Sequence, residues 1–298
     1  MAFDVASAPA GTQFLTFGAV HLDVVDRDRS VAWWRDVVGL PVLAEHGAVV
    51  ELGVDGEALI VLHAGAVARA TRDHSGLYHL AINLPSEPAL AQVLSRLLTL
   101  GARFGATDHI VAKSLYLQDP NGVGLELTFE TPERVATVRW PESSPHPDIV
   151  DSEGRLRHGL EDLDLDALLA AAPGGDPRQP VPAGTKVGHL HLQVGDLETS
   201  YGFYRDRLGL EPWNYVPAIG YGDLGAGAPF THRIAVNTWQ GAGLPPAPAG
   251  TAGMRHATIR FDTSERLRHA LARVDAVQSA DGAAVVRDPD GNAIHLTA

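Results

Sequence analysis

Two segments of the chain share one pattern of apolar and polar positions. The segment LDVVDRDRSVAWWRDVVGL begins at residue 22, and LQVGDLETSYGFYRDRLGL begins at residue 192. Each starts with alternating apolar and polar residues, as in a half-buried strand, and continues with apolar residues at helical spacing. An aspartate is placed to cap each predicted helix and a glycine to end it: Asp26 and Gly39 in the first copy, Asp196 and Gly209 in the second. The pattern predicts a strand followed by a helix at both places.

A second pair of repeats follows these segments. GLYHLAINLP (residues 76–85) corresponds to GMRHATIRFD (residues 253–262), and helices are predicted after them at residues 87–100 and 264–274. Each copy closes with two strands around a turn, LQDPNGVGLEL or VRDPDGNAIHL, in which DPNG and DPDG are strong hairpin signals. We therefore interpret the chain as the order strand, helix, three strands, repeated four times. This is an α+β design in which helices cover one face of mainly antiparallel strands.

Length and local charge divide the chain into parts. A chain of 298 residues exceeds the usual size of one domain. Residues 141–178 carry nine acidic side chains against three basic ones and are rich in Pro and Gly, which is typical of a solvated connector. We predict a first domain at residues 1–135, a connector at 136–182 and a second domain at 183–298, with two βαβββ modules in each domain. A short helix is expected at residues 164–171, docked through three leucines: Leu165, Leu168 and Leu169.

Composition excludes several classes of protein. The chain has no cysteine, so disulfides and thiolate sites are absent, and any metal must be held by His, Asp, Glu or backbone oxygen. A net charge of −13 argues against a nucleic-acid partner, because phosphates would be repelled. The start, MAFDVASAPAGTQ, lacks a basic region followed by an apolar run, and no stretch approaches a membrane span. We therefore expect a cytoplasmic protein with no membrane partner.

The module order and these motifs resemble the vicinal oxygen chelate superfamily, which includes glyoxalase I, bleomycin-resistance proteins and extradiol dioxygenases. Two stretches resemble two-domain catechol 2,3-dioxygenases more closely: GLYHLAINLP with GATDHIVAKSLYLQDPNGVGLELTFE, and GTKVGHLHLQVGDLETSYGFYRDRLGL with HRIAVNTWQG. The resemblance implies four βαβββ modules paired into two half-open mixed β-barrel domains. It also implies a metal ion on a concave face, with ligands from the first strand of one module and the first and last strands of the next.

In the second half, the resemblance places a histidine at each of the three metal-ligand positions: His189, His256 and His295. The family has Glu where this chain has His295. Three imidazoles can bind Zn, Fe, Co, Ni or Cu and leave coordination positions open for substrate. His191 and His232 are expected to line the same cavity and to contact substrate. His191 faces the same side of its strand as His189, and His232 lies on a strand where the related dioxygenases carry several histidines.

In the first half, the resemblance implies an incomplete metal site. His79 and Glu126 match two ligands of the dioxygenase family, while His109 matches its acid–base histidine and Tyr116 its substrate-contacting tyrosine. The third ligand position holds Ala19. The resemblance therefore leaves this metal site one ligand short.

Three interpretations of the first-half site remain open. It is a relic, with catalysis moved to the second half; or it binds metal with His21 or water as the third ligand; or its polar side chains form a hydrogen-bonded cluster without metal. His21 lies two residues beyond the matching position, about 6.6 Å along a strand, so its use requires a shift in register.

The resemblance implies a metal-dependent extradiol-type ring-cleavage dioxygenase that acts on a catechol-like aromatic. Its cofactor would be a divalent metal, with Fe(II) as the first choice and Zn or Mn as alternatives. A second hypothesis is that the three-histidine site is a Lewis acid in an isomerase, lyase or hydrolase. A third is a protein that binds a small aromatic ligand without catalysis. The expected partner is a small aromatic substrate, and a homo-oligomer is left open.

Overall fold

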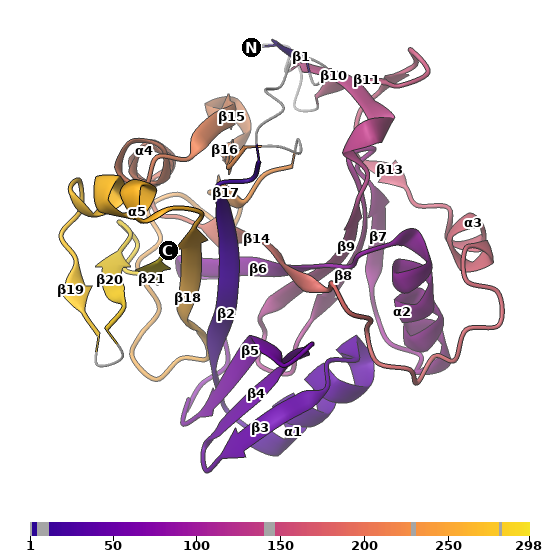
Figure 1. Cartoon of the computed structure of the whole chain (residues 1–298), viewed down its shortest axis with the longest axis horizontal. Helices are drawn as coiled ribbons and strands as arrows, with labels where there is room; N and C mark the ends of the chain where they lie inside the picture. Colours follow the sequence, from indigo (N-terminus) through magenta and orange to yellow (C-terminus); the bar gives the residue numbers. More distant parts are fainter. Residues whose placement is uncertain (1, 5–11, 140–146, 228–230, 280–281) are drawn as a thin grey trace.

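The polypeptide forms two large curved sheets with helices on their outer sides (Figure 1). A computed structural model describes residues 2–4, 12–139, 147–227, 231–279 and 282–298. The large sheets have nine and eight strands, and a four-stranded sheet stands beside them. Parallel and antiparallel pairs occur in both large sheets, and neither closes into a barrel. The predicted α+β fold of half-open mixed sheets is confirmed.

Four modules of one strand, one helix and three strands build the large sheets, as predicted. The first contains β2 (Leu15–Val24), α1 (Arg27–Trp33), β3 (Val42–His46), β4 (Val49–Val54) and β5 (Glu57–Ala64). The second contains β6 (Gly76–Asn83), α2 (Glu87–Thr99), β7 (Gly105–Asp108), β8 (Ala112–Gln118) and β9 (Gly124–Glu130). In both, the first strand runs parallel to the last.

The other two modules repeat this order after the connector. The third contains β14 (Lys186–Gln193), α4 (Leu197–Gly202), β15 (Glu211–Val216), β16 (Tyr221–Gly225) and β17 (Ile234–Asn237). The fourth contains β18 (Gly253–Phe261), α5 (Ser264–Leu271), β19 (Val277–Gln278), β20 (Ala284–Arg287) and β21 (Ala293–Thr297). Here too the first strand is parallel to the last. Each helix contacts strands of its own module, which places the apolar core between helices and sheet.

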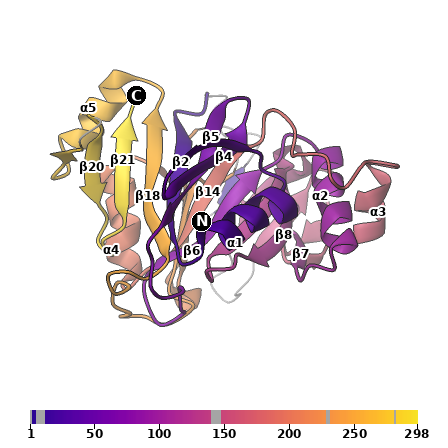
Figure 2. The same cartoon turned by 90° about the horizontal axis from the view of Figure 1, so that it is seen from below.

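Each large sheet joins modules from opposite halves of the chain. The nine-stranded sheet combines the second and third modules, and the eight-stranded sheet combines the fourth and first. Antiparallel pairing of β6 with β14 forms one seam, and pairing of β18 with β2 forms the other (Figure 2). The large sheets therefore do not follow the predicted division into residues 1–135 and 183–298, because each contains one module from the first half and one from the second. The first strand of every module has a free edge that any other first strand can satisfy, so the repeats alone do not determine the partners.

The connector at residues 136–182 is largely folded. With β1 (Ala2–Asp4), the small sheet contains β10 (Val135–Arg139), β11 (Asp148–Asp151) and β12 (Leu156–Arg157), while β13 (Glu161–Asp162) pairs with β7. The expected helix is present as α3 (Leu165–Ala170), capped by Asp164 and docked through the fully buried Leu168. Residues 140–146 of the predicted connector lie outside the described residues.

Ion pairs within the connector help to hold its acidic segment in a defined fold. Asp151 pairs with Arg155 at 2.8 Å and with Arg157 at 3.3 Å, and Arg157 also pairs with Glu161. The buried side chain of Ile149 anchors this part of the chain in a small apolar cluster. The segment is thus folded, while most of its acidic side chains are exposed to solvent: Glu153, Asp162, Asp164, Asp166 and Asp176.

Equivalent contacts tie neighbouring modules together within each half. The Asn121 amide nitrogen in the first DPxG turn donates to the Ser30 hydroxyl on α1 at 3.0 Å. In the second half, the Ser200 hydroxyl on α4 donates to the Asp290 carboxyl group at 2.7 Å. Both serines are buried, and they occupy the same position in the repeat. The capping aspartates predicted before these helices are confirmed, since each accepts from a backbone N–H three residues on.

The two serines form a matched pair for a test of stability. We expect Ser200→Ala to lower the free energy of unfolding by about 1.5–3 kcal/mol, because it removes a hydrogen bond to a carboxyl group. Ser30→Ala removes two bonds to neutral groups, one from the Asn121 amide and one to the Asp26 carbonyl oxygen. Both partners keep another hydrogen bond, so the change should cost about 1 kcal/mol. Urea unfolding of both variants measures the difference. Equal costs would show that the carboxyl group of Asp290 is no better a partner for Ser200 than the neutral groups are for Ser30.

Candidate metal centre

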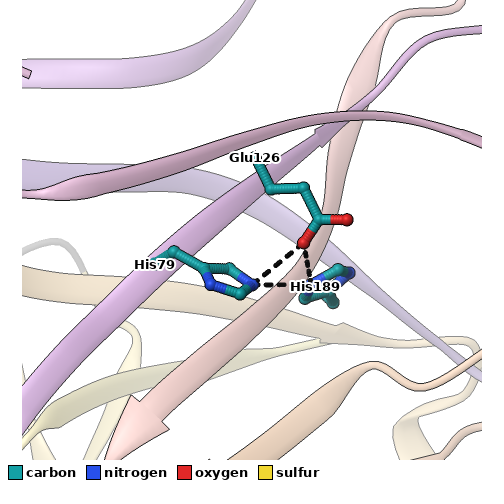
Figure 3. Close-up of side chains that lie close together, drawn as sticks. All are labelled: His79, Glu126 and His189. Atoms are coloured by element: carbon teal, nitrogen blue, oxygen red, sulfur yellow. Dashed lines mark hydrogen bonds and ion pairs between the residues drawn. The ribbon is translucent and has the colours of Figure 1, made fainter. Parts of the chain in front are cut away.

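Three buried side chains from three strands of the nine-stranded sheet converge on one point (Figure 3). His79 Nε2 on β6 lies 3.0 Å from Glu126 Oε2 on β9 and 3.2 Å from His189 Nε2 on β14. The third side of the triangle, between His189 Nε2 and Glu126 Oε2, is 3.2 Å. Among the described residues, these three side chains place their potential ligand atoms close enough together to share one metal ion.

Strand register explains the convergence. Ala81 on the central strand β6 is the partner of Glu126 in the parallel pair with β9 and of His189 in the antiparallel pair with β14. Side chains alternate along a strand, so His79 lies on the same face as Ala81, two residues away. The methyl group of Ala81 leaves room for the three larger side chains above it. A second module must supply His189, because one module alone holds only His79 and Glu126.

The geometry fits a divalent metal. Atoms 3.0–3.2 Å apart that each lie about 2.1 Å from one ion subtend angles of about 90–100° at it. Such angles correspond to one face of an octahedron, with the opposite positions open. Ser114 donates to Glu126 Oε1 at 2.6 Å, which leaves Oε2 directed at the two imidazoles. His79, His189 and Glu126 are therefore suited to hold the ion, and Ser114 orients the carboxylate.

The protonation states favour metal binding. Burial alone would raise the pKa of Glu126, but His189 and His79 outweigh it and hold that pKa well below its usual range. Burial lowers the pKa of His79, despite the opposing effect of Glu126. Glu126 is thus an anion at neutral pH, and His79 offers a free lone pair, as ligands must.

A histidine–tyrosine pair lies beside the three ligands. His109 Nδ1 lies 2.7 Å from the Gly159 carbonyl oxygen, and since a carbonyl can only accept, Nδ1 carries the proton. His109 Nε2 in the neutral ring is then an acceptor, and the Tyr116 hydroxyl donates to it at 2.8 Å. Tyr116 is the cross-strand partner of Glu126, and its ring lies 5.7 Å from that of His79. The folded connector, which provides Gly159, therefore selects the tautomer of His109.

An elongated cavity of about 1200 Å³ opens over the centre. Aromatic side chains form one wall: the ring of Trp239 lies 5.6 Å from Tyr221, 5.7 Å from Tyr78 and 5.2 Å from His191. The connector adds an apolar rim with Ile149. The cavity thus combines a polar metal centre with flat apolar surfaces.

Further polar groups line the wall that the third module provides. His191 accepts from the Asn237 amide at 2.7 Å, and burial holds the pKa of His191 well below its usual value. The His232 ring stands 4.2 Å from that of His189, and burial likewise lowers the pKa of His232. Asp223, which is fully buried, has its pKa raised by burial to about 6. Both histidines are neutral at pH 7 and border the cavity, as expected for substrate-contacting groups.

The chain is similar in sequence to known proteins. A glyoxalase-like domain family model matches residues 19–128, and the model for the glyoxalase/bleomycin resistance protein/dioxygenase superfamily matches residues 186–296. The chain is 30% identical over 279 residues to a catechol-2,3-dioxygenase of Bacillus subtilis (strain 168), with 91% of this chain and 93% of that protein covered. The chain belongs to the vicinal oxygen chelate superfamily.

Solved structures share the vicinal oxygen chelate fold of this chain. A putative dioxygenase from Bacillus subtilis has a TM-score of 0.59 at 12% identity, covering 96% of this chain and 86% of its own. Glyoxalase I from Zea mays has a TM-score of 0.52 at 17% identity, covering 95% and 92%. At these identities the likeness shows the fold alone. In the described chain no helix is both long and apolar enough to span a membrane.

The predicted ligand set of this vicinal oxygen chelate protein needs correction. His189 does not meet His256 and His295, because β14 belongs to the nine-stranded sheet and β18 and β21 to the eight-stranded one. It meets His79 and Glu126, and neither His21 nor water is needed as their third ligand. The prediction assumed that consecutive modules pair, whereas β6 pairs with β14 across the connector.

Other parts of the site had no clear signal in the sequence. Gly159 lies in a segment read as solvated, and Asp223 stands on a short strand without a recognisable motif. Trp239 and Asn237 lie in the stretch HRIAVNTWQG, in which the resemblance indicates a role for His232 alone. Several residues whose positions the resemblance implied do border the cavity: His109, Tyr116, His191 and His232.

Mn(II) binding by variants identifies the ligands. Mn(II) favours sites with carboxylate ligands, so we expect His79→Ala, His189→Ala and Glu126→Gln each to weaken Mn(II) binding by about 100-fold or more. His256→Ala is the control and should bind Mn(II) as the wild type does. Electron paramagnetic resonance of free Mn(II) gives the affinities. Loss of binding in His256→Ala with retention in His189→Ala would restore the original ligand assignment.

The raised pKa of Asp223 makes the stability of the protein depend on pH. Its folded pKa of about 6 lies above the unfolded value of 3.8, so the folded state binds more protons, and stability falls as pH rises through 6. Between pH 5 and 7 the wild type should lose about 1 kcal/mol relative to Asp223→Asn. Denaturant unfolding of both metal-free proteins at each pH measures this loss. Parallel pH profiles would show that Asp223 ionises normally.

Proposed function

We propose that this chain is a metal-dependent extradiol-type ring-cleavage dioxygenase acting on a catechol-like aromatic. The observation that carries the proposal is the two-histidine, one-carboxylate centre with the His109–Tyr116 pair beside it. This ligand set with open positions is typical of non-haem Fe(II) oxygenases. The catechol-2,3-dioxygenase relative, which aligns over 91% of the chain, supports the same reaction class.

Fe(II) is the proposed metal, with Mn as the alternative, held by His79, Glu126 and His189. When bound, the metal supplies open positions for two adjacent substrate oxygens and for dioxygen, and it mediates electron transfer between them. Glu126 contributes one negative charge, so the three ligands leave a Fe(II) centre with a net charge of +1. With a metal bound, this net positive charge would lower the pKa of a nearby catechol hydroxyl, so that His109 could take its proton more easily.

Substrate recognition rests on the aromatic wall. A planar ring fits against Tyr78, Tyr221 and Trp239, whose side chains supply apolar and π surfaces at little entropic cost. The neutral His191 and His232 border the ring without adding charge. The cavity of about 1200 Å³ exceeds what one catechol ring fills, so we propose a substrate with a second ring or a large apolar substituent.

Proton transfer falls to His109. Its Nε2 is an acceptor as long as Gly159 holds the proton on Nδ1, so it can take a proton from a substrate hydroxyl and return it to the product. The Tyr116 hydroxyl, whose pKa is raised well above its usual value by burial and by Glu126, stays protonated and donates a hydrogen bond. Without substrate the two groups satisfy each other, because Tyr116 donates to His109 Nε2. When Tyr116 donates to a substrate oxygen instead, His109 Nε2 is released as an acceptor at the ring edge.

The overall reaction balances without a further reductant. The carbon–carbon bond between a hydroxylated ring carbon and its neighbour outside the diol breaks, and both atoms of dioxygen enter the product. One new end is a carboxylate and the other an aldehyde or ketone. The four electrons that reduce dioxygen come from the substrate, so the required partners are the aromatic and dioxygen alone.

The proposal predicts oxygen consumption that depends on His109 and Tyr116. In the Fe(II)-loaded protein, His109→Gln should lower kcat by roughly 10²–10⁴-fold with oxygen and a two-ring catechol as substrates. Tyr116→Phe should lower it by about 10-fold or more, through loss of one hydrogen bond. The exposed His46 offers a control, His46→Gln, with unchanged kcat. Oxygen uptake and absorbance of the ring-opened product are measured together.

Two outcomes would contradict this function. Tight binding of the catechol with no oxygen uptake in the Fe(II)-loaded wild type would indicate a ligand-binding protein. Turnover of a substrate with bound Zn(II) and without oxygen would indicate Lewis-acid chemistry at the same three ligands.

A further inference from the structure

Four histidines form a row across the eight-stranded sheet, away from the metal centre. They lie on four neighbouring strands in the order β21, β18, β2, β5: His295, His256, His21 and His63. The sequence neighbours on each strand point into the apolar core: Ile294, Ala257, Leu22 and Leu62. Because side chains alternate, the histidines share the face turned away from the helices. All four are partly buried.

The side chains in the row touch one another. His21 Nδ1 lies 2.8 Å from His63 Nε2, so these two nitrogens point at each other. The ring of His256 stacks on that of His21 with centroids 3.9 Å apart, and His295 stacks on His256 at 3.8 Å. His256 and His21 are direct cross-strand partners. Register therefore imposes the stack, which does not depend on long side chains reaching across a gap.

The row is not a copy of the centre in the other sheet. His256 on β18 corresponds to His79 on β6. His295 on β21 corresponds to Glu126 on β9, because each pairs with the residue two positions after that histidine: Thr258 and Ala81. His21 corresponds to His191, however, since it pairs with His256 as His191 pairs with His79. The position equivalent to His189 is Ala19. The set that includes His21 and His63 is thus a distinct group of nitrogen donors.

We propose that His21 and His63, with His256 as a third donor, bind a second metal ion of the borderline class, Zn(II), Ni(II) or Cu(II). The donors are all imidazoles, which suit these ions and disfavour Mg(II) and Mn(II). Nitrogens that each lie about 2.0–2.1 Å from an ion are about 3.0–3.4 Å apart. The His21–His63 pair, at 2.8 Å, has to open by only a few tenths of an ångström, while the His256 ring turns toward it.

The electrostatic surroundings permit a cation. Burial and the neighbouring histidines lower the pKa of His21 to about 3, so its ring is neutral at pH 7. Burial also lowers the pKa of His63. The nearby guanidinium of Arg255 is paired with Asp23 at 2.9 Å, so its charge is largely matched. A bound ion would join strands from residues 15–64 and 253–261 and so stabilise the β2–β18 seam between the two halves of the chain.

Zinc titration of the full chain, without an affinity tag and stripped of metal, tests this inference. A chromophoric chelator reports free Zn(II). The wild type should bind two equivalents, and His21→Ala and His63→Ala should each weaken one of them by about 100-fold or more. His46→Ala, an exposed histidine at the end of β3 in the same sheet, is the matched control and should keep both.

A second background separates the two sites. In His79→Ala, one Zn(II) equivalent should remain and should raise the melting temperature, and His63→Ala added to this background should abolish the rise. Circular dichroism without metal verifies the fold of each variant, and His21→Gln and His63→Gln replace any alanine variant that fails to fold. A single equivalent in the wild type that His79→Ala abolishes, or two equivalents that persist in both the His21 and His63 variants, would overturn the proposal. Neither result depends on ring-cleavage activity.

Discussion

The antiparallel pairing of β6 with β14 is the constraint on which the site depends. It sets Ala81 opposite His189, while the parallel pair of β6 with β9 sets the same Ala81 opposite Glu126. A shift of one residue would turn His189 to the core face of the sheet and leave a buried carboxylate with one partner. Main-chain hydrogen bonds between segments 110 residues apart in sequence thus fix a triangle of atoms with sides of 3.0–3.2 Å.

The same pairing gives the connector its role. Because the second and third modules share a sheet, the chain between them must return alongside that sheet, where β13 adds to β7 and Gly159 reaches His109. The connector therefore does more than join the two halves of the chain: its Gly159 fixes the proton on Nδ1 of His109, the candidate acid–base residue. The first and fourth modules form the eight-stranded sheet. There His295 occupies the position of Glu126, and the potential metal ligands of the row are all imidazoles.

Most of the local structure could be predicted from the sequence, because local signals determine it. Asp26 and Asp196 cap their helices, the DPNG and DPDG turns join their strands, and all four modules have the expected order. His79, His109, Tyr116 and Glu126 were found by resemblance, and they do lie together. What failed was the choice of partner: equivalent first strands have equivalent edges, and only packing over the whole chain decides which edges meet. The misassigned triad of His189, His256 and His295 follows from that one error.

Anomalous diffraction from a crystal of the Fe(II)-loaded protein, measured on both sides of the iron edge, is the most direct test of this account. It predicts an iron peak about 2.0–2.2 Å from His79 Nε2, His189 Nε2 and a Glu126 oxygen, with Ser114 still bonded to the other carboxylate oxygen. An iron peak coordinated by His256 and His295, with none beside His189, would contradict it.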